Sequence, residues 1–134
     1  MTFVDTNILI DVTSGDPVWA DRSSQALASA HARGPSLMNA TAYAEFAIGF
    51  ESQSDCDAAI EELDLTLAEI PSSAAFRAAQ AFREYRRGGG VHTRALPDFF
   101  IGAHASVAAA PLLTRDARRY RTYFPELTLL TPEA

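Results

Sequence analysis

Short apolar runs alternate along the chain with longer segments whose apolar residues recur at helical spacing. The chain opens with Thr2-Phe3-Val4, a run that favours a buried, extended backbone and ends at Asp5. Thr6 and Asn7 suit the turn into a helix that we expect to end at about Val12. Four further strands are predicted at 35–38, 65–70, 111–114 and 127–130, the last at an edge of the sheet.

The segments between these strands have the periodicity of amphipathic helices. We expect Asn39 to cap the helix after the second strand, and Gly88-Gly89-Gly90 to end a long helix over 72–87. Because strands alternate with helices, the sequence predicts an α/β sandwich built on a parallel sheet. The predicted helices cover 17–32, 39–50, 53–64, 72–87, a segment from Pro97, and a short turn at 115–120.

Size and composition fit one compact domain. The chain has 134 residues, 48% of them hydrophobic and 21% charged, so it can bury a core and is not expected to be disordered. No apolar run approaches the ~18 residues that cross a bilayer, and no leader pattern is visible, so we expect a cytoplasmic protein without a membrane partner. Cys56 is the single cysteine, and three scattered histidines make no zinc pattern.

The charges are distributed unevenly along the chain. A net charge of -6 argues mildly against a simple electrostatic binder of nucleic acid. However, residues 1–67 hold 11 acidic residues and 2 arginines, whereas residues 68–134 hold 6 acidic residues and 9 arginines. Arginine suits phosphate through its forked guanidinium. Candidates for contact with the phosphates of a nucleic acid are Arg86, Arg87, Arg94, Arg115, Arg118 and His92, although a solvated surface position is the simpler explanation for each.

Four carboxylates occupy positions where ligands bind in parallel α/β sheets. Asp5 ends the first strand, and Glu45 lies in the second turn of the helix after the second strand. Asp98 follows Pro97 in a first helical turn, and Asp116 comes two residues after the fourth strand. Ligands of such sheets bind at the carboxyl ends of the strands. Since several buried carboxylates are tolerable only with a neutralising cation, these hard oxygen ligands indicate a site for Mg²⁺ or Mn²⁺.

Each acid also has an ordinary structural explanation. Asp98 suits the positive end of a helix dipole, and Asp116 suits a turn or a helix cap. Glu45 is harder to explain in this way, because Thr41 and Gly49 place it on a polar, small-residue stripe. Taken together, the four acids favour a metal site. Three other aspartates are expected at the surface, namely Asp11, Asp16 and Asp21.

Four segments resemble the motifs of PIN-domain ribonucleases and, more narrowly, of the VapC toxins of bacterial toxin–antitoxin pairs. Each motif is short, but the four follow one another in the family's order and spacing and cover nearly the whole chain. They are Val-Asp-Thr-Asn-Ile-Leu-Ile at 4–10, Asn-Ala-Thr-Ala-Tyr-Ala-Glu-Phe at 39–46, Leu-Pro-Asp-Phe-Phe-Ile-Gly-Ala-His-Ala at 96–105, and Leu-Leu-Thr-Arg-Asp-Ala-Arg-Arg-Tyr at 112–120.

This resemblance implies a single PIN domain over residues 1–134. Its fold would be a three-layer α/β/α sandwich with a mostly parallel sheet in strand order 3-2-1-4-5. It also implies Mg²⁺ or Mn²⁺ in an acidic pocket and endonucleolytic cleavage of RNA. The acidic quartet would be Asp5, Glu45, Asp98 and Asp116, although many relatives have asparagine at the last position. The supporting residues would be Thr6, Asn7 and Thr114.

The resemblance assigns roles to these residues. Asp5, Asp98 and Asp116 would hold the metal, while Glu45 would help to hold a second ion or orient the attacking water. The family also implies a homodimer and a cognate VapB-like antitoxin, whose tail lies across a groove and often places an arginine near the acids. Candidate groove residues are Trp19, Phe46, Phe50, Ile60 and Leu63, with a core position preferred for Phe46.

Other functions remain open at this point. Asp5 is also placed to act as the covalent nucleophile of a phosphatase or dehalogenase, but that chemistry usually needs a lysine, and the chain has none. Alternatively, the chain is an inactive PIN fold that serves as a binding module, although four mutually repelling acids give a scaffold no advantage. A DNA- or structure-specific nuclease is disfavoured because the chain lacks the long insertions of such enzymes.

Overall fold

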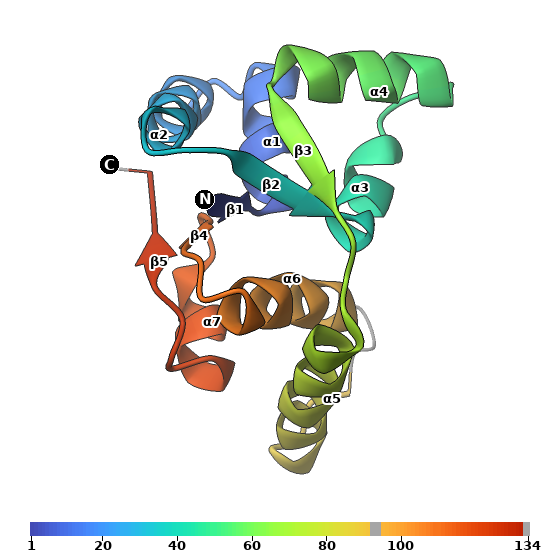
Figure 1. Cartoon of the computed structure of the whole chain (residues 1–134), viewed down its shortest axis with the longest axis vertical. Coiled ribbons are helices and arrows are strands. Elements are labelled where there is room, and N and C mark those ends of the chain that lie inside the picture. Colours follow the sequence, from blue (N-terminus) through green and yellow to red (C-terminus); the bar gives the residue numbers. More distant parts are fainter. Residues whose placement is uncertain (92–94, 133–134) are drawn as a thin grey trace.

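The fold is built on a five-stranded sheet between helical layers (Figure 1). The computed structural model describes residues 1–91 and 95–132. The strand order is β3-β2-β1-β4-β5, and every neighbouring pair is parallel. The predicted fold class and strand order are therefore confirmed. The strands are β1 (Thr2–Val4), β2 (Ser36–Asn39), β3 (Leu65–Ala68), β4 (Leu112–Leu113) and β5 (Leu129–Leu130).

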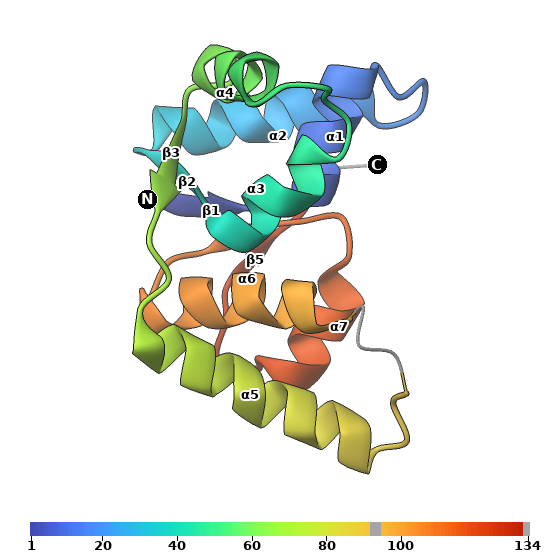
Figure 2. The same ribbon diagram turned by 90° about the vertical axis from the view of Figure 1, so that its right-hand side faces the viewer.

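Helices cover both faces of the sheet (Figures 1 and 2). Helices α1, α2 and α4 lie on one side, and α5, α6 and α7 lie on the other. Helix α3 lies beside the sheet and packs on both α1 and α6. Their bounds are α1 (Thr6–Ser14), α2 (Ala20–Ala32), α3 (Ala40–Ala47), α4 (Gln53–Glu62), α5 (Ser72–Arg87), α6 (Leu96–Val107) and α7 (Ala117–Tyr123).

A side-chain cap and a glycine turn explain where two helices depart from their predicted limits. Asp16 accepts the backbone N–H groups of Val18 and Trp19, which holds this segment in a turn and delays the start of α2 to Ala20. Helix α1 extends beyond the predicted Val12 and ends where Gly15 adopts a left-handed backbone, with φ of 67°. The predicted cap at Asn39 is confirmed, since its side chain accepts the N–H groups that open α3.

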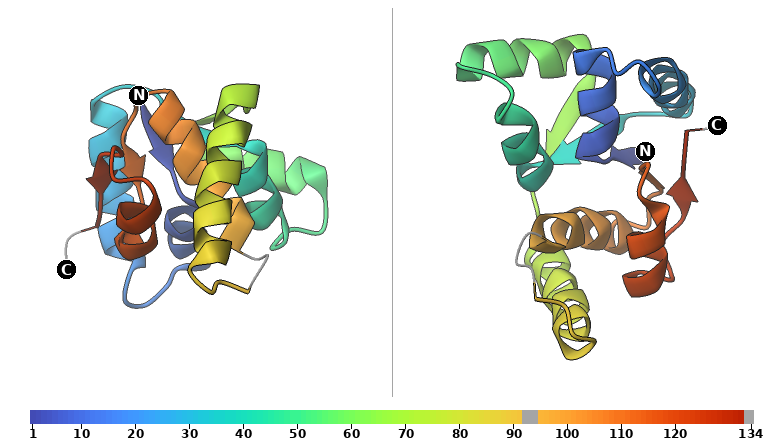
Figure 3. Two further views of the ribbon diagram at one scale, coloured as in Figure 1. Left: turned by 90° about the horizontal axis from the view of Figure 1, so that it is seen from below. Right: turned by 180° about the vertical axis from the view of Figure 1, so that it is seen from behind.

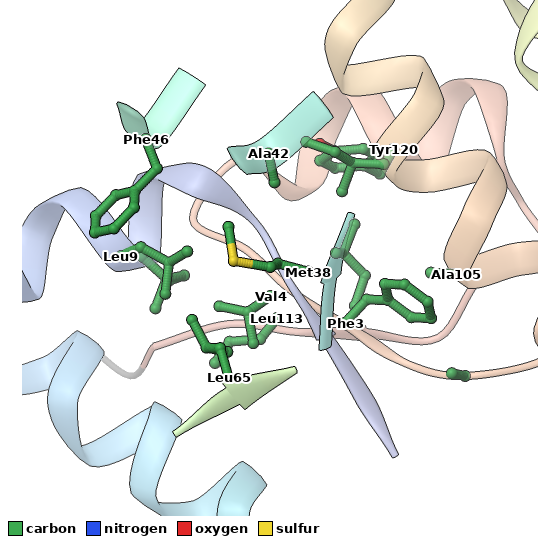
Figure 4. Close-up of a cluster of buried hydrophobic side chains, with 14 of the residues drawn as sticks. Phe3, Val4, Leu9, Met38, Ala42, Phe46, Leu65, Ala105, Leu113 and Tyr120 are labelled. Carbon is green, nitrogen blue, oxygen red and sulfur yellow. The ribbon is translucent and has the colours of Figure 1, made fainter. Parts of the chain in front are cut away.

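The alternating side chains of β1 join the two halves of the core (Figure 4). Phe3 faces α6, where its ring lies 4.5 Å from the ring of His104. Val4 points to the opposite face, toward Leu9 and Met38. Both faces of the strand are buried, as expected for the centre of a parallel sheet. The carboxyl end of β1, and with it Asp5, is therefore fixed from both sides.

An aromatic cluster fixes the helices on the second face. Helix α5 runs alongside α6, as seen from below and from behind in Figure 3. The Phe99 ring of α6 meets Tyr85 of α5 at 5.6 Å and Tyr123 of α7 at 5.2 Å, each edge to face. Because Asp98 precedes Phe99, this packing also fixes the start of α6.

None of the helices within the described ranges is long and apolar enough to cross a membrane.

We expect Gly102→Ala to destabilise the protein, although alanine is the better helix former. A methyl group at Gly102 would lie 2.9 Å from ring atoms of both Tyr120 and Phe124, so α7 would have to move away from α6. The crowding should cost about 1–3 kcal/mol and exceed the gain of about 1 kcal/mol in helix propensity. Urea unfolding measures the difference, with Gly49→Ala as the control, because that position makes only ordinary contacts. A more stable Gly102 variant would contradict the packing described here.

Candidate active site at the carboxyl edge of the sheet

Asp5 lies at the centre of the site. It follows β1 directly and caps α1, because its Oδ1 atom accepts the N–H of Thr6 at 2.8 Å. Its own N–H donates to the carbonyl of Leu113 in β4 at 2.9 Å, so the backbone is held at the end of two neighbouring strands. The side chain is only 4% exposed. A strand and a helix thus place one buried carboxylate at the sheet edge.

Donors from two other segments hold the second carboxylate oxygen of Asp5. The hydroxyl of Thr114, just after β4, donates to Oδ2 at 2.7 Å, and the hydroxyl of Tyr120 in α7 donates at 3.0 Å. The Nδ2 group of Asn7 donates more weakly, at 3.4 Å. Asn7 also accepts the N–H of Arg115 at 3.2 Å, which ties the loop after β1 to the loop after β4. Asp5 is therefore fixed by residues more than a hundred positions away.

The charge of Asp5 is poorly compensated. The pKa of Asp5 is raised to about 6 as the net result of opposing effects. Burial raises it most and the charge of Asp98 also raises it, whereas the hydrogen bonds from Thr114, Tyr120 and Thr6 lower it. Among the described residues, no arginine or histidine forms an ion pair with Asp5. A buried carboxylate that has hydrogen-bond donors but no counter-ion favours the approach of a cation.

Asp98 is the second acid of the site and does have a basic partner. It lies in the first turn of α6, after Pro97, and accepts Nη1 of Arg119 at 2.7 Å. Burial raises the pKa of Asp98, Arg119 lowers it, and the charge of Asp116 raises it again. Burial is the largest cause of the raised pKa values of Asp5 and Glu45, and the negative charge of Asp98 also raises both. Its charge therefore couples all four predicted acids.

The other two acids occupy unequal positions. Glu45 of α3 is half-buried and accepts the hydroxyl of Thr6 at 3.1 Å. Asp116 is exposed at the start of α7, where its side chain makes no capping bond and its N–H donates to Thr114. Asp5, Glu45 and Asp98 line one groove of about 710 Å³, whereas Asp116 is not among the residues that line it.

The donor chemistry of this groove fits a hard divalent cation, because three carboxylates from distant segments face one space. The side chains as they stand do not form a closed set of ligands: among the described residues, no three Asp, Glu, His or Cys side chains converge closely enough to hold an ion. The reason is visible in the contacts, since Asp98 is turned to Arg119 and Glu45 to Thr6.

The groove has an apolar wall beside the acids. Phe46 and Phe50, both expected from the sequence, line it, together with Ile10 and the 85% exposed Ile48, which the sequence analysis did not name. The other three predicted groove residues, Trp19, Ile60 and Leu63, do not line it. Helical periodicity could not separate these positions, because it marks apolar faces without showing which face remains uncovered.

The surface position predicted for Asp11 is wrong. Asp11 is 2% exposed and forms a bidentate ion pair with Arg115, with N–O distances of 2.8 and 2.9 Å. Ser23 donates to the same carboxylate at 2.8 Å, and the guanidinium of Arg115 lies 4.8 Å from the centre of the Trp19 ring. The guanidinium of Arg115, a predicted RNA contact, is thus occupied within the protein. Asp11 and Arg115 lie 104 positions apart in the chain, so no local sequence pattern indicates their pairing.

The structure adds two residues that sequence reasoning missed, namely Tyr120 and Arg119. Both lie in α7, which was predicted only as a short turn, and their partners are more than twenty positions away in sequence. The motif Arg-Arg-Tyr gave a local signal, but the pairing depends on how α7 packs against α6. Two predicted RNA contacts, His92 and Arg94, lie outside the described residues, while Arg86, Arg87 and Arg118 are exposed.

A sheet edge that gathers acids in this way is typical of metal-dependent hydrolases, and comparison with known proteins identifies the family. The PIN domain profile matches residues 2–125. The chain belongs to the PIN-domain family, which confirms the family resemblance read from its motifs. A search of curated proteins finds no match.

Solved structures with the same fold include toxin–antitoxin complexes. A chain of VapBC2 from Rickettsia felis, bound to a DNA fragment from its promoter, has a TM-score of 0.75 at 17% identity, with 98% of each chain covered. A toxin–antitoxin complex from Klebsiella pneumoniae has a TM-score of 0.72 at 25% identity, with 99% of this chain and 98% of that chain covered. VapBC-1 from nontypeable Haemophilus influenzae has a TM-score of 0.73 at 19% identity, with 97% of this chain and 96% of that chain covered.

We expect Arg115→Gln to destabilise the protein by about 2 kcal/mol, because it leaves the buried carboxylate of Asp11 without its counter-ion. This value lies below that for fully buried pairs, since the Arg115 side chain is 31% exposed. The double variant Asp11→Asn with Arg115→Gln should recover at least half of the loss. Urea unfolding measures both, and the exposed neighbour Arg118→Gln is the matched control. Equal stability of the Arg115 and Arg118 variants would show that the pair has no structural role.

We expect Asp5→Asn to stabilise the protein at pH 7.5 in the presence of EDTA. The pKa of Asp5 is about 6 in the folded state, compared with 3.8 for an ordinary aspartate. Between these two pH values, Asp5 is mostly protonated in the folded protein and mostly ionised in the unfolded chain. Stability is therefore lost as pH rises from about 4 to about 6, by at most about 3 kcal/mol. The variant lacks this loss, so its advantage should grow over that range and then stay constant. Urea unfolding at pH 4 and 7.5 tests this, with the exposed Asp21→Asn as the control.

Proposed function

We propose that this protein is a metal-dependent endoribonuclease and the toxin of a VapBC-type toxin–antitoxin pair. The observation that carries the proposal is the buried carboxylate of Asp5, which shares a groove with Glu45 and Asp98 and has no basic partner among the described residues. Membership of the PIN family supports nuclease chemistry at this groove. A scaffold without catalytic function would have no reason to keep these acids together.

Asp5, Asp98 and Asp116 would hold Mg²⁺ or Mn²⁺, and Glu45 would help to hold a second ion or orient water. Of the four, Asp116 is the least secure ligand, because it is exposed and outside the groove lining. A divalent cation bound there would lower the pKa of water and offset the phosphate charge that develops during cleavage. The positions of these acids would determine where the cation binds and, therefore, where cleavage takes place.

Three neutral donors would keep Asp5 in position for this role. Thr114 and Tyr120 fix its Oδ2 atom, and the N–H of Thr6 occupies one side of Oδ1. These bonds favour the ionised form of Asp5, which is the form that binds a cation. Thr6 also donates to Glu45, whose pKa is raised by burial and, less strongly, by the charge of Asp98. Asn7 donates more weakly to the same Oδ2 atom of Asp5, at 3.4 Å, so Thr6, Asn7 and Thr114 would all act as supporting residues.

The substrate proposed for this groove is RNA. The protein carries a net charge of -6, so attraction to a polyanion would depend on cations in the groove and on exposed arginines. Arg118 of α7 and the pair Arg86 and Arg87 at the end of α5 are exposed and available for phosphate contacts.

The apolar wall beside the acids supports an antitoxin as the partner. Phe46, Phe50, Ile10 and Ile48 would bind the apolar side chains of a peptide segment, and the acids would attract a basic residue next to them. The similar solved structures from Rickettsia felis and Klebsiella pneumoniae are toxin–antitoxin complexes. Family resemblance further supports a homodimer of this chain.

We expect Asp5→Asn and Asp98→Asn to lower the rate of RNA cleavage at least about 100-fold, because each removes a charged ligand of the cation. The assay uses purified protein and a mixture of transfer, ribosomal and messenger RNA, with Mg²⁺ or Mn²⁺ and with EDTA. Asp21→Asn in α2 is the control, since it removes an exposed carboxylate far from the groove. Unchanged cleavage by Asp5→Asn, or cleavage in EDTA, would refute this mechanism.

The same protein preparations separate the alternative functions. A binding module without a metal site would melt at the same temperature with and without Mn²⁺, whereas a cation at 100 times its Kd should add about 2.7 kcal/mol of stability. An Asp5 nucleophile of the phosphatase type would instead trap labelled phosphate on the protein. Neither alternative predicts loss of RNA cleavage specifically on changing Asp5 or Asp98.

A further inference from the structure

Arg119 forms an ion pair inside the candidate active site. Its Nη1 atom lies 2.7 Å from Oδ2 of Asp98, with 35% of the Arg119 side chain and 25% of the Asp98 side chain exposed. The two other ion pairs in the described part of the chain, Arg77–Glu126 and Arg115–Asp11, involve no acid that lines the groove. Arg119 is therefore the basic residue that neutralises a groove acid directly.

A guanidinium and a divalent cation compete for the same carboxylate. Asp98 lines the groove with Asp5 and Glu45, so it is one of the acids that a cation bound in the groove would contact. Arg119 occupies the Oδ2 atom of Asp98 at 2.7 Å. A cation that binds Oδ2 must therefore displace the guanidinium, and each of the two would weaken binding of the other.

The structure leaves Arg119 free to move without moving its helix. Tyr120, the next residue, is buried and anchored on Asp5, and the Tyr120 and Phe124 rings pack against Gly102 of α6. The Arg119 side chain itself is only half-buried and bonds Asp98 through Nη1; among the described residues its other N–H groups have no acceptor, so they can bind a second one. Asp98 lines the groove, and a rotation about the side-chain torsions of Arg119 can move the guanidinium without moving α7.

We propose that Arg119 exchanges partners: it holds Asp98 while the groove has no divalent cation, and it contacts a phosphate group of bound nucleic acid once the cation occupies Asp98. This inference rests on the proposed function, because it takes the groove to be the site of cation and RNA binding. The exchange keeps Asp98 neutralised in both states. It also links RNA affinity to cation binding through one side chain.

The test measures Mn²⁺ affinity by calorimetry in wild type, Arg119→Gln and Arg121→Gln, without RNA. Loss of the competing guanidinium should tighten Mn²⁺ binding by about fivefold, as expected for a partly exposed ion pair. Arg121→Gln removes the same charge from an exposed position of α7 and should change the affinity by less than about twofold. Near-ultraviolet circular dichroism checks that both variants are folded. Unchanged or weaker Mn²⁺ binding by Arg119→Gln would overturn the exchange.

A second measurement follows binding of a non-cleavable RNA analogue in the presence of Mn²⁺. Arg119→Gln should weaken binding and reduce the slope of log affinity against log salt by about 0.7, the value for one phosphate contact on a single strand. Arg119→Lys keeps the charge and should restore this slope. If Arg119→Gln leaves RNA binding and its salt slope unchanged, Arg119 does not contact phosphate and the proposal is wrong.

The failure of this inference can be told apart from the failure of the proposed function. If wild type binds Mn²⁺ no more tightly than Asp5→Asn, the metal site itself is refuted, and the partner exchange with it. If wild type binds Mn²⁺ through Asp5 but the Arg119 variants behave like Arg121→Gln, only the exchange is refuted.

Discussion

The burial of one carboxylate at the edge of a parallel sheet is the constraint on which the site depends. Asp5 is enclosed because it follows the central strand, whose two faces are both covered by helices. Four donors hold it, yet burial still leaves its pKa at about 6, because neutral hydrogen bonds only partly replace the hydration of a charge. The fold thus maintains a negative charge where it is unfavourable, which is typical of a functional site.

The acids around the sheet edge differ in how they are neutralised. Asp11 is paired with Arg115 and serves to join α1 to the loop after β4. Asp98 is paired with Arg119 at a similar distance, but its side chain is 25% exposed, compared with 3% for Asp11. Asp5 has only hydrogen-bond donors. Within the described part of the chain, the three acids thus range from a closed ion pair at Asp11 to a buried carboxylate without an ion pair at Asp5. This difference distinguishes Asp11, which joins two segments, from the two acids that line the groove.

Local patterns predicted the alternation of strands and helices and three of the acids that line one groove, whereas the strand order followed from the family resemblance. The local causes are an apolar run before Asp5, a cap at Asn39, and a proline before Asp98. The sequence did not predict the burial of Asp11, the donor from Tyr120 or the pair formed by Arg119. Each of these depends on how α7 and the loop after β4 pack on distant segments, and no periodicity within one element records that packing. The roles of Thr6, Asn7, Thr114 and the four acids remain predictions.

The most direct test of the central claim is a crystal structure of the protein grown with Mn²⁺, in which anomalous scattering locates the ion. We expect an anomalous peak about 2.0–2.3 Å from carboxylate oxygens of Asp5 and Asp98, with the Thr114 and Tyr120 bonds to Asp5 retained. A map with no anomalous peak at Asp5, at Mn²⁺ concentrations that support activity or above, would show that Asp5 does not bind a divalent cation.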